Sequence, residues 1–263
     1  MLPTITVFGL AIPMYGPLIL IGCILGLMIA VYRPVKHDLP RQDIFFSALY
    51  ALVGAVIGAK LLYLAISLPT LIAAHGPSGW TLDEITALFT HGFAFYGGLI
   101  GAVGGVYIYS KQFRLPTWHL LDSLIPSVPL IHAIGRIGCF CAGCCYGMHA
   151  DPPWGVYFRA DSVAPLNVSL FPVQLLEAAL NFILFAVLYR FSRKPRADRQ
   201  ITGLYIACYG IMRFILEFFR GDADRGMLLT LSTSQWISLA FVPLGLYWLL
   251  KTKKRQESVD TSN

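Results

Sequence analysis

The chain has 263 residues, of which 56% are hydrophobic and only 13% are charged, and its formal net charge is +6. A soluble domain carries about twice that share of charged residues. The composition therefore excludes an ordinary soluble protein and predicts a membrane protein.

We expect an all-α, polytopic membrane protein with seven transmembrane helices. Crossing a hydrocarbon core of about 30 Å takes about 20 helical residues. Seven apolar stretches are long enough, near residues 12–33, 44–68, 93–112, 117–137, 172–192, 201–220 and 234–251. The first has no Lys or Arg before Arg33 and is too long for the apolar part of a cleavable signal peptide. We therefore expect it to be retained, and residues 1–251 to form one seven-helix domain.

Lys and Arg are concentrated in alternate connections, which predicts the orientation, because short cytoplasmic loops of membrane proteins are rich in positive charge. The connections after spans one, three, five and seven carry Arg33, Lys36 and Arg41; Lys111 and Arg114; Arg190, Arg193, Lys194, Arg196 and Arg199; and Lys251, Lys253, Lys254 and Arg255. The N-terminus and residues 69–92 carry none. We expect the N-terminus outside and the C-terminus, with a polar tail at 252–263, in the cytoplasm. The net charge reflects this asymmetry, so nucleic-acid binding is not predicted.

The third span begins with a glycine-rich stretch, YGGLIGAVGG, from Tyr96. Glycine lets two helices, or a backbone and a ligand, approach closely. The stretch is therefore interpreted either as a helix-packing surface or, through Gly97 and Gly98, as part of a ligand site.

The fourth span ends in GRIGCFCAGCCYG, residues 135–147, with Arg136 inside the apolar stretch. Its cysteines, Cys139, Cys141, Cys144 and Cys145, are too cramped for the two separated ligand pairs of a usual zinc site, and no metal is predicted. A local disulfide, small packing residues, or a nucleophile activated by Arg136 remain as interpretations.

Residues 138–171 form the longest outward connection and contain Pro152, Pro153 and Pro165. Because proline interrupts helices, this segment cannot be one regular helix. We expect it to fold as a cap over the outer mouth of the helix bundle.

Charged groups inside the membrane are the strongest functional signal, because each costs about 2.5 kcal/mol or more at the bilayer centre. In YGIMRFILEFFRGD the spacing stacks Arg213, Glu217 and Arg220 on one helix face. This set is either a structural ion-pair ladder or, together with Arg136, an anion site for the forked oxygens of a phosphate. Gln174 and Glu177, in PVQLLEA, are placed to orient polar ligand groups or to satisfy a neighbouring helix.

These segments together resemble the prolipoprotein diacylglyceryl transferase family. The resemblance is carried, in order, by MYG near Tyr15, FYGGLIG at 95–101, GRIGCF at 135–140, PVQLLE at 172–177, YGIMRFILEFFRGD at 209–222 and SQW at 234–236. The family signature G-R-x-G-N-F-x-N-x-E-x-x-G is matched by Gly135, Arg136, Gly138, Phe140 and Gly147.

The chain also departs from the family pattern. Cys139 and Ala142 stand where the signature has asparagines, and Cys144 stands where it has glutamate. Tyr96 replaces the histidine of the H-G-G-L-I-G segment, and Phe171 and Leu176 replace the histidine and tyrosine of H-P-x-Q-L-Y-E.

The resemblance implies transfer of the diacylglyceryl group of phosphatidylglycerol to the lipobox cysteine thiol of a preprolipoprotein, in the bacterial inner membrane, with no cofactor. The leaving group is a phosphate ester, which needs cations in a water-poor site. The expected catalytic residues are Arg136, Arg213, Tyr96, His132 and Glu217, with His132 or Tyr96 assisting deprotonation of the thiol. The expected phospholipid-binding residues are Arg136, Arg220, Gly97, Gly98, Tyr15 and Gln174.

Two alternatives remain at this point. One is a related phosphatidylglycerol-dependent transferase with a different acceptor, and the other is a non-catalytic carrier or receptor for an anionic lipid. A carrier is expected to show internal repeats or matched pairs of broken helices, and the sequence shows neither.

Overall fold

The computed structural model describes residues 4–7, 10–33, 39–75, 81, 86, 88, 92–159, 162–221 and 227–251. The predicted polar tail at 252–263 lies outside these residues. The chain forms two compact units, one combining residues 1–38 with 122–263 and the other comprising residues 39–121.

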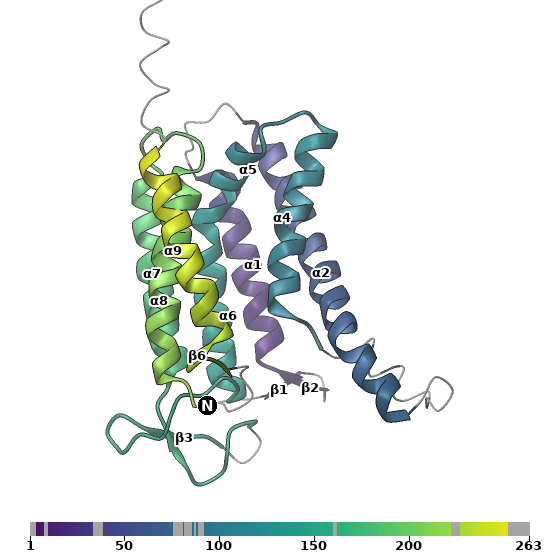
Figure 1. Cartoon of the computed structure of the whole chain (residues 1–263), viewed down its shortest axis with the longest axis vertical. Helices are drawn as coiled ribbons and strands as arrows, with labels where there is room; N and C mark the ends of the chain where they lie inside the picture. Colours follow the sequence, from purple (N-terminus) through teal and green to yellow (C-terminus); the bar gives the residue numbers. More distant parts are fainter. Residues whose placement is uncertain are drawn as a thin grey trace, which may run out of the picture. The chain divides into compact units, whose positions relative to one another are not determined.

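Each of the seven predicted spans contains a helix (Figure 1). The helices are α1 (Tyr15–Tyr32), α2 (Arg41–His75), α4 (Phe95–Gln112), α5 (Thr117–Leu124), α6 (Val128–Ala142), α7 (Val173–Phe191), α8 (Gln200–Leu216) and α9 (Thr233–Lys251). Two 3₁₀ turns, η1 (Ile125–Ser127) and η2 (Glu217–Phe219), connect α5 to α6 and extend α8. Within the described residues, five helical segments are long and apolar enough to cross a membrane. The prediction of an all-α polytopic membrane protein is therefore confirmed.

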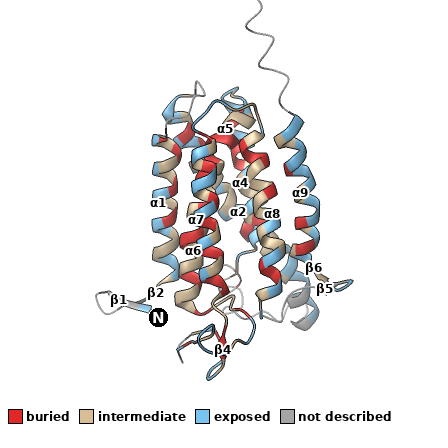
Figure 2. Ribbon diagram, turned by 90° about the vertical axis from the view of Figure 1, so that its left-hand side faces the viewer, coloured by how far each residue is buried: buried red, intermediate tan, exposed pale blue. Residues whose placement is uncertain are grey.

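The first unit contains α1, α6, α7, α8 and α9. Figures 1 and 2 show these helices side by side, and buried residues recur along α6 and α7. The end of α1, the turn between α7 and α8, and the end of α9 all lie at one end of this unit, and the β3–β4 hairpin lies at the other. The predicted basic connections of this unit thus share one end, while the side of the membrane that it faces stays a prediction.

Three short antiparallel hairpins, which the sequence analysis did not predict, accompany the helices. They pair β1 (Thr4–Val7) with β2 (Leu10–Pro13), β3 (Val156–Tyr157) with β4 (Ser169–Leu170), and β5 (Met227–Leu228) with β6 (Leu231–Ser232). The β3–β4 hairpin belongs to the predicted cap. The cap begins later than expected, because α6 continues to Ala142 and ends at Gly143, whose positive φ of 70° is typical of a helix C-terminus.

The cap has a small hydrophobic core of its own. Phe158, Ala164 and Leu170 are buried there, and Phe140 of α6 packs against them. Burying this apolar surface, at about 25 cal/mol per Å², holds the cap on the end of α6.

The second unit is built on close contact between α2 and α4. A Cβ atom on Gly101 would lie 2.0 Å from the carbonyl oxygen of Gly54, and one on Gly97 would lie 2.3 Å from that of Gly58. Both helices therefore present glycine at four-residue spacing, which brings the backbones together. These contacts agree with the interpretation of the glycine-rich stretch as a helix-packing surface.

Candidate active site

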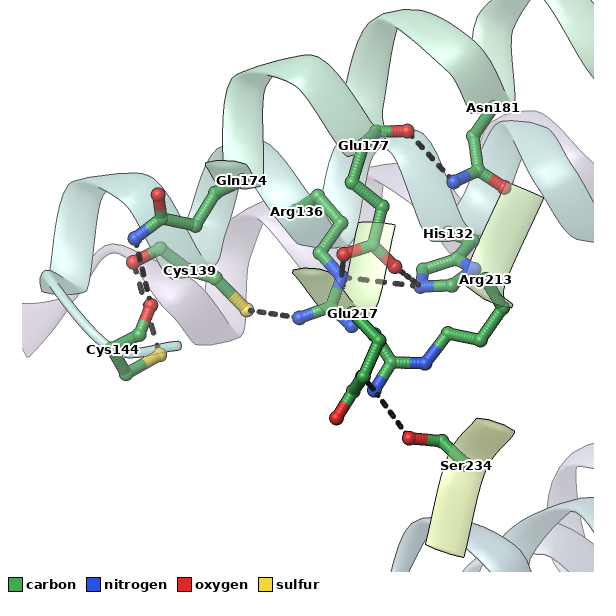
Figure 3. A network of polar contacts seen from close by, with 10 residues as sticks. All are labelled: His132, Arg136, Cys139, Cys144, Gln174, Glu177, Asn181, Arg213, Glu217 and Ser234. Carbon is green, nitrogen blue, oxygen red and sulfur yellow. Dashed lines mark hydrogen bonds and ion pairs between the residues drawn. The ribbon is translucent and has the colours of Figure 1, made fainter. Parts of the chain in front are cut away.

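The centre of the site is an ion pair between α6 and α7 (Figure 3). Nε of Arg136 lies 3.0 Å from Oε2 of Glu177, whose side chain is only 2% exposed. Nε2 of His132, one helical turn before Arg136, lies 3.3 Å from Arg136 Nε and 3.4 Å from Glu177 Oε1. His132 is thus in place to accept a hydrogen bond from the guanidinium when neutral and to donate one to the carboxylate when protonated.

A second ion pair lies at the end of α8. Nη2 of Arg213 is 2.7 Å from Oε2 of Glu217, four residues later, and 3.2 Å from the Oγ of Ser234 on α9. The two arginines come from different helices, and His132 interacts electrostatically with both. Figure 3 shows both side chains directed into the space where Glu177 and His132 lie.

Buried polar groups surround these ion pairs. Gln174, Glu177 and Asn181 share one face of α7 and are almost fully buried. Asn181 donates to the carbonyl oxygen of Glu177 at 2.8 Å, and Gln174 donates to the carbonyl oxygen of Cys144 at 2.9 Å. Among the described residues, Nη1 of Arg213, Oε1 of Gln174 and Oδ1 of Asn181 are buried without a hydrogen-bond partner. Because an unsatisfied buried polar atom is costly, these three atoms have the capacity to bind a polar ligand.

Two glycines tie the cap to the end of α8. Gly147 pairs in an antiparallel bridge with Arg220, and the N–H of Gly221 donates to the carbonyl oxygen of Tyr146. A Cβ on Gly147 would lie 2.4 Å from the carbonyl oxygen of Phe171, and one on Gly221 would lie 2.3 Å from that of Gly147. Only glycine fits at these two positions. Their close contact holds the cap segment that follows α6 against the segment that follows α8.

An apolar groove of about 320 Å³ runs between α8 and α9. Ile211, Phe214, Leu239 and Val242 line it, together with Ser238. Ser238 lies one helical turn from Ser234, which binds Arg213. The groove therefore places apolar surface close to a buried guanidinium.

Comparison with known proteins identifies the family. The model of the prolipoprotein diacylglyceryl transferase family matches residues 3–251. The chain belongs to this family. It is 37% identical over 240 residues to the phosphatidylglycerol–prolipoprotein diacylglyceryl transferase of Clostridium tetani, covering 91% of this chain and 93% of that one. It is also 33% identical over 255 residues to phosphatidylglycerol–prolipoprotein diacylglyceryl transferase 2 of Clostridium perfringens, covering 96% of each.

The cysteines of the family signature segment form a cluster. The Sγ atoms of Cys139, Cys144 and Cys145 all lie within 4.8 Å of one another, and Cys141 is outside the group. The six cysteines, all within the described residues, carry free thiols, so the local disulfide that was one interpretation of this segment is not formed. Hydrogen bonding with Cys139 and Cys145 raises the pKa of the Cys144 thiol far above its usual value. Hydrogen bonds with Cys139 and Cys144, helped by Arg136 and Arg220, hold the pKa of the Cys145 thiol far below it.

The sequence predicted that Arg213, Glu217 and Arg220 share one helix face, and this prediction is wrong for Arg220. Arg213 and Glu217 pair as expected, but α8 ends at Leu216 and η2 ends at Phe219. Arg220 then has extended backbone, with φ −85° and ψ 141°, and belongs to the bridge with Gly147. Its guanidinium also helps to lower the pKa of the Cys145 thiol at the cap.

The structure brings the other predicted residues of the first unit together. Tyr15, at the start of α1, packs over Gly138, where a Cβ would lie 3.3 Å from the tyrosine ring, and it interacts electrostatically with Arg136. Gln174 contacts the cap through Cys144, as described above. Both residues thus lie next to the cysteine cluster and Arg136.

Tyr96, Gly97 and Gly98 lie in the second unit. Gly97 is accounted for by packing against α2, whereas a Cβ on Gly98 would make only ordinary contacts of 3.5 Å with Ala55 and Ala59. Tyr96 packs edge-on against Phe95, with ring centroids 5.7 Å apart. Their roles in catalysis and lipid binding stay predictions.

Some partners and groups of the site were not predicted. Glu177 was expected either to orient polar ligand groups or to satisfy a neighbouring helix; its pairing with Arg136 of α6 agrees with the second, but the identity of this partner follows only from the packing of α7 on α6. The ring of Tyr209 lies 5.6 Å from that of His132 and stacks on Tyr205. Ser234 was seen only as part of SQW. One sequence feature could have pointed to the buried polar face of α7, because Glu177 and Asn181 are polar residues four apart in an apolar span.

Proposed function

We propose that this chain transfers the diacylglyceryl group of phosphatidylglycerol to the lipobox cysteine thiol of a prolipoprotein, giving a thioether and glycerol phosphate. Membership of the family provides the reaction class. The observation that carries the proposal is the pair of guanidiniums, from α6 and α8, that are each held by a buried glutamate near one histidine.

The chemistry needs positive charge where the phosphate leaves. When the carbon–oxygen bond of the lipid breaks, the electron pair stays on the phosphate oxygen, and a guanidinium stabilises that charge most strongly where water is excluded. Arg136 and Arg213 have side chains only 15% exposed, which meets this condition. We assign Arg136 and Arg213 to the phosphate, and we assign Glu177 and Glu217 to holding the two guanidiniums in position.

The buried atoms without partners support a binding role as well as a structural one. A purely structural pair would satisfy its own hydrogen-bonding groups, whereas Arg213 Nη1 has no partner among the described residues. A phosphate oxygen would supply one. The apolar groove between α8 and α9 provides a surface for an acyl chain beside it.

The acceptor thiol must also lose its proton, because the thiolate is the nucleophile. We assign this proton to His132, whose Nε2 lies between the Arg136 guanidinium and the Glu177 carboxylate. We place the acceptor at the cap end of the first unit, facing the outer side of the bacterial inner membrane.

A direct assay tests this function. Purified protein is incubated in detergent with labelled phosphatidylglycerol and a lipobox peptide, and the peptide is analysed by mass spectrometry. The expected result is the mass gain of one diacylglyceryl group on the cysteine peptide and none on a control peptide with serine in its place.

Two outcomes would contradict the proposal. Release of glycerol phosphate without labelled peptide would indicate a different acceptor. Tight binding of phosphatidylglycerol without release of glycerol phosphate would indicate a carrier or receptor.

A further inference from the structure

The cysteine cluster at the cap end of α6 is not used by the mechanism above. Cys139 comes from the last turn of α6, and Cys144 and Cys145 come from the turn that follows it. Sequence spacing argued against a metal because no separated ligand pairs exist. The fold brings three sulfurs together without such pairs.

The backbone is shaped to make this cluster. Side chains of adjacent residues in an extended chain point to opposite sides, yet the sulfurs of Cys144 and Cys145 join one group. Cys145 achieves this with a positive φ of 56°, a conformation that costs a non-glycine residue about 1–2 kcal/mol. Such strain persists where the surroundings enforce it, and it concentrates at functional sites. Here the hydrogen bond from Gln174 to the Cys144 carbonyl holds the turn.

The three sulfurs suit a thiophilic cation. Thiolates favour ions such as Zn²⁺ over hard cations. A tetrahedral site with Zn–S bonds of about 2.3 Å places its sulfurs about 3.8 Å apart. Since the present separations are at most 4.8 Å, closing the site needs movements of about 1 Å or less. Three protein ligands leave the fourth position of the ion open for a substrate.

The open position would lie beside the proposed phosphate site. Nη1 of Arg136 is 3.9 Å from the Cys139 sulfur, while Nε of the same guanidinium pairs with Glu177. Three thiolates on a divalent ion carry a net charge of −1, which the guanidinium offsets. Arg136 is therefore in contact with both the sulfur cluster and the network proposed to bind the phospholipid phosphate.

We propose that Cys139, Cys144 and Cys145 bind Zn²⁺, and that the acceptor thiol occupies the fourth position of the ion as a thiolate. The second half of this proposal rests on the transferase function. A thiol that coordinates zinc is deprotonated at neutral pH. The zinc-bound sulfur attacks the lipid carbon, so a sulfur–carbon bond forms and the carbon–oxygen bond to phosphate breaks. The proton of the acceptor thiol passes to His132 and from there to the departing glycerol phosphate. The step is a substitution and needs no oxidant or reductant.

Metal binding is tested without any activity measurement. Purified full-length protein is loaded with Zn²⁺, desalted and analysed for metal, and a parallel sample is loaded with Co²⁺ for absorption spectroscopy. We expect one equivalent of metal and an intense sulfur-to-cobalt charge-transfer band. Cys139→Ser, Cys144→Ser and Cys145→Ser should each reduce the metal content at least tenfold.

Cys141→Ser is the matched control, because Cys141 lies in the same segment but outside the cluster. It should retain the full equivalent and the band. Equal metal content in Cys141→Ser and Cys145→Ser, or no bound metal in folded wild-type protein, would overturn the proposal. Because Cys139 is buried and its variant could misfold, the thermal midpoint of each variant is measured without metal; Zn²⁺ should raise the midpoint of wild type and Cys141→Ser only.

The role of the ion is tested by adding peptide to the Co²⁺ form. A lipobox peptide with cysteine should shift the cobalt spectrum, and its serine analogue should not. An unchanged spectrum would overturn the role in thiol activation. Transfer that proceeds in metal-free protein at the wild-type rate would overturn this inference while leaving the transferase function intact. Metal binding without any diacylglyceryl transfer would contradict the proposed function instead.

Discussion

The α2–α4 pair and the α6–α7–α8 group bring helices together in opposite ways. In the first, glycines allow the backbones to touch, and Gly54 and Gly101 have no room for a side chain. In the second, Arg136, Glu177 and Arg213 fill the space between helices with charge. Backbone contact is a stable way to pack helices where water is absent. Buried charges are costly, so we attribute the polar group to the proposed catalysis and not to packing alone.

The comparison predicts that removing a charge from the polar group lowers activity as well as stability. Arg136→Ala should lower the transfer rate by about 10²–10³-fold, the loss expected when one donor to developing negative charge is removed. Arg136→Lys keeps the charge but loses the forked geometry of the guanidinium. Its transfer rate should therefore lie between those of the wild type and Arg136→Ala. Peptide lipidation measured by mass spectrometry, with the thermal midpoint as a folding control, gives both values. A wild-type rate in Arg136→Ala would remove the proposed mechanism.

Glu177→Gln should affect activity and stability together. The substitution keeps the shape of the side chain but leaves the guanidinium of Arg136 without its carboxylate, and breaking a buried pair in this way costs about 3 kcal/mol or more. We expect a lower thermal midpoint and a reduced transfer rate. Arg136→Ala combined with Glu177→Gln should lose less stability than the sum of the single changes. An additive double mutant would show that the two groups act independently.

Gly101→Ala should act on stability alone. The added Cβ would lie 2.0 Å from the Gly54 carbonyl oxygen, and forcing extra volume into a packed interface costs about 1–3 kcal/mol. Gly104→Ala on the same helix is the matched control, because a Cβ there meets nothing within 4 Å. Thermal unfolding in detergent should show a lower midpoint for the first and an equal or higher one for the second. Unchanged stability in Gly101→Ala would contradict the packing role of the glycines.

Ser234→Ala should have the smallest effect. It removes one hydrogen bond to Arg213, worth about 1 kcal/mol, while the Glu217 pair keeps the guanidinium in place. We expect the transfer rate to fall about fivefold, corresponding to that free energy. A loss as large as that of Arg136→Ala would place Ser234 in direct contact with substrate.

Much of the molecule could be predicted locally. Hydrophobic length predicted seven helical spans, and the structure places a helix at each of them. Proline content predicted an irregular cap, and four-residue spacing predicted the Arg213–Glu217 pair. The predicted position of Arg220 on the helix face of Arg213 and Glu217 was wrong, because periodicity assumes a continuous helix, whereas the helix ends with η2 and Arg220 bridges to Gly147.

The sequence by itself determined the class of protein, the helical character of the seven apolar stretches and the residue types available for phosphate chemistry. These depend on hydrophobicity and spacing along one helix, which are local properties. Tertiary structure decided which carboxylate holds Arg136, which sulfurs meet at the end of α6, and which glycines serve packing. Those outcomes depend on contacts between α6, α7 and the cap, whose residues are far apart in sequence and meet only when the helices pack.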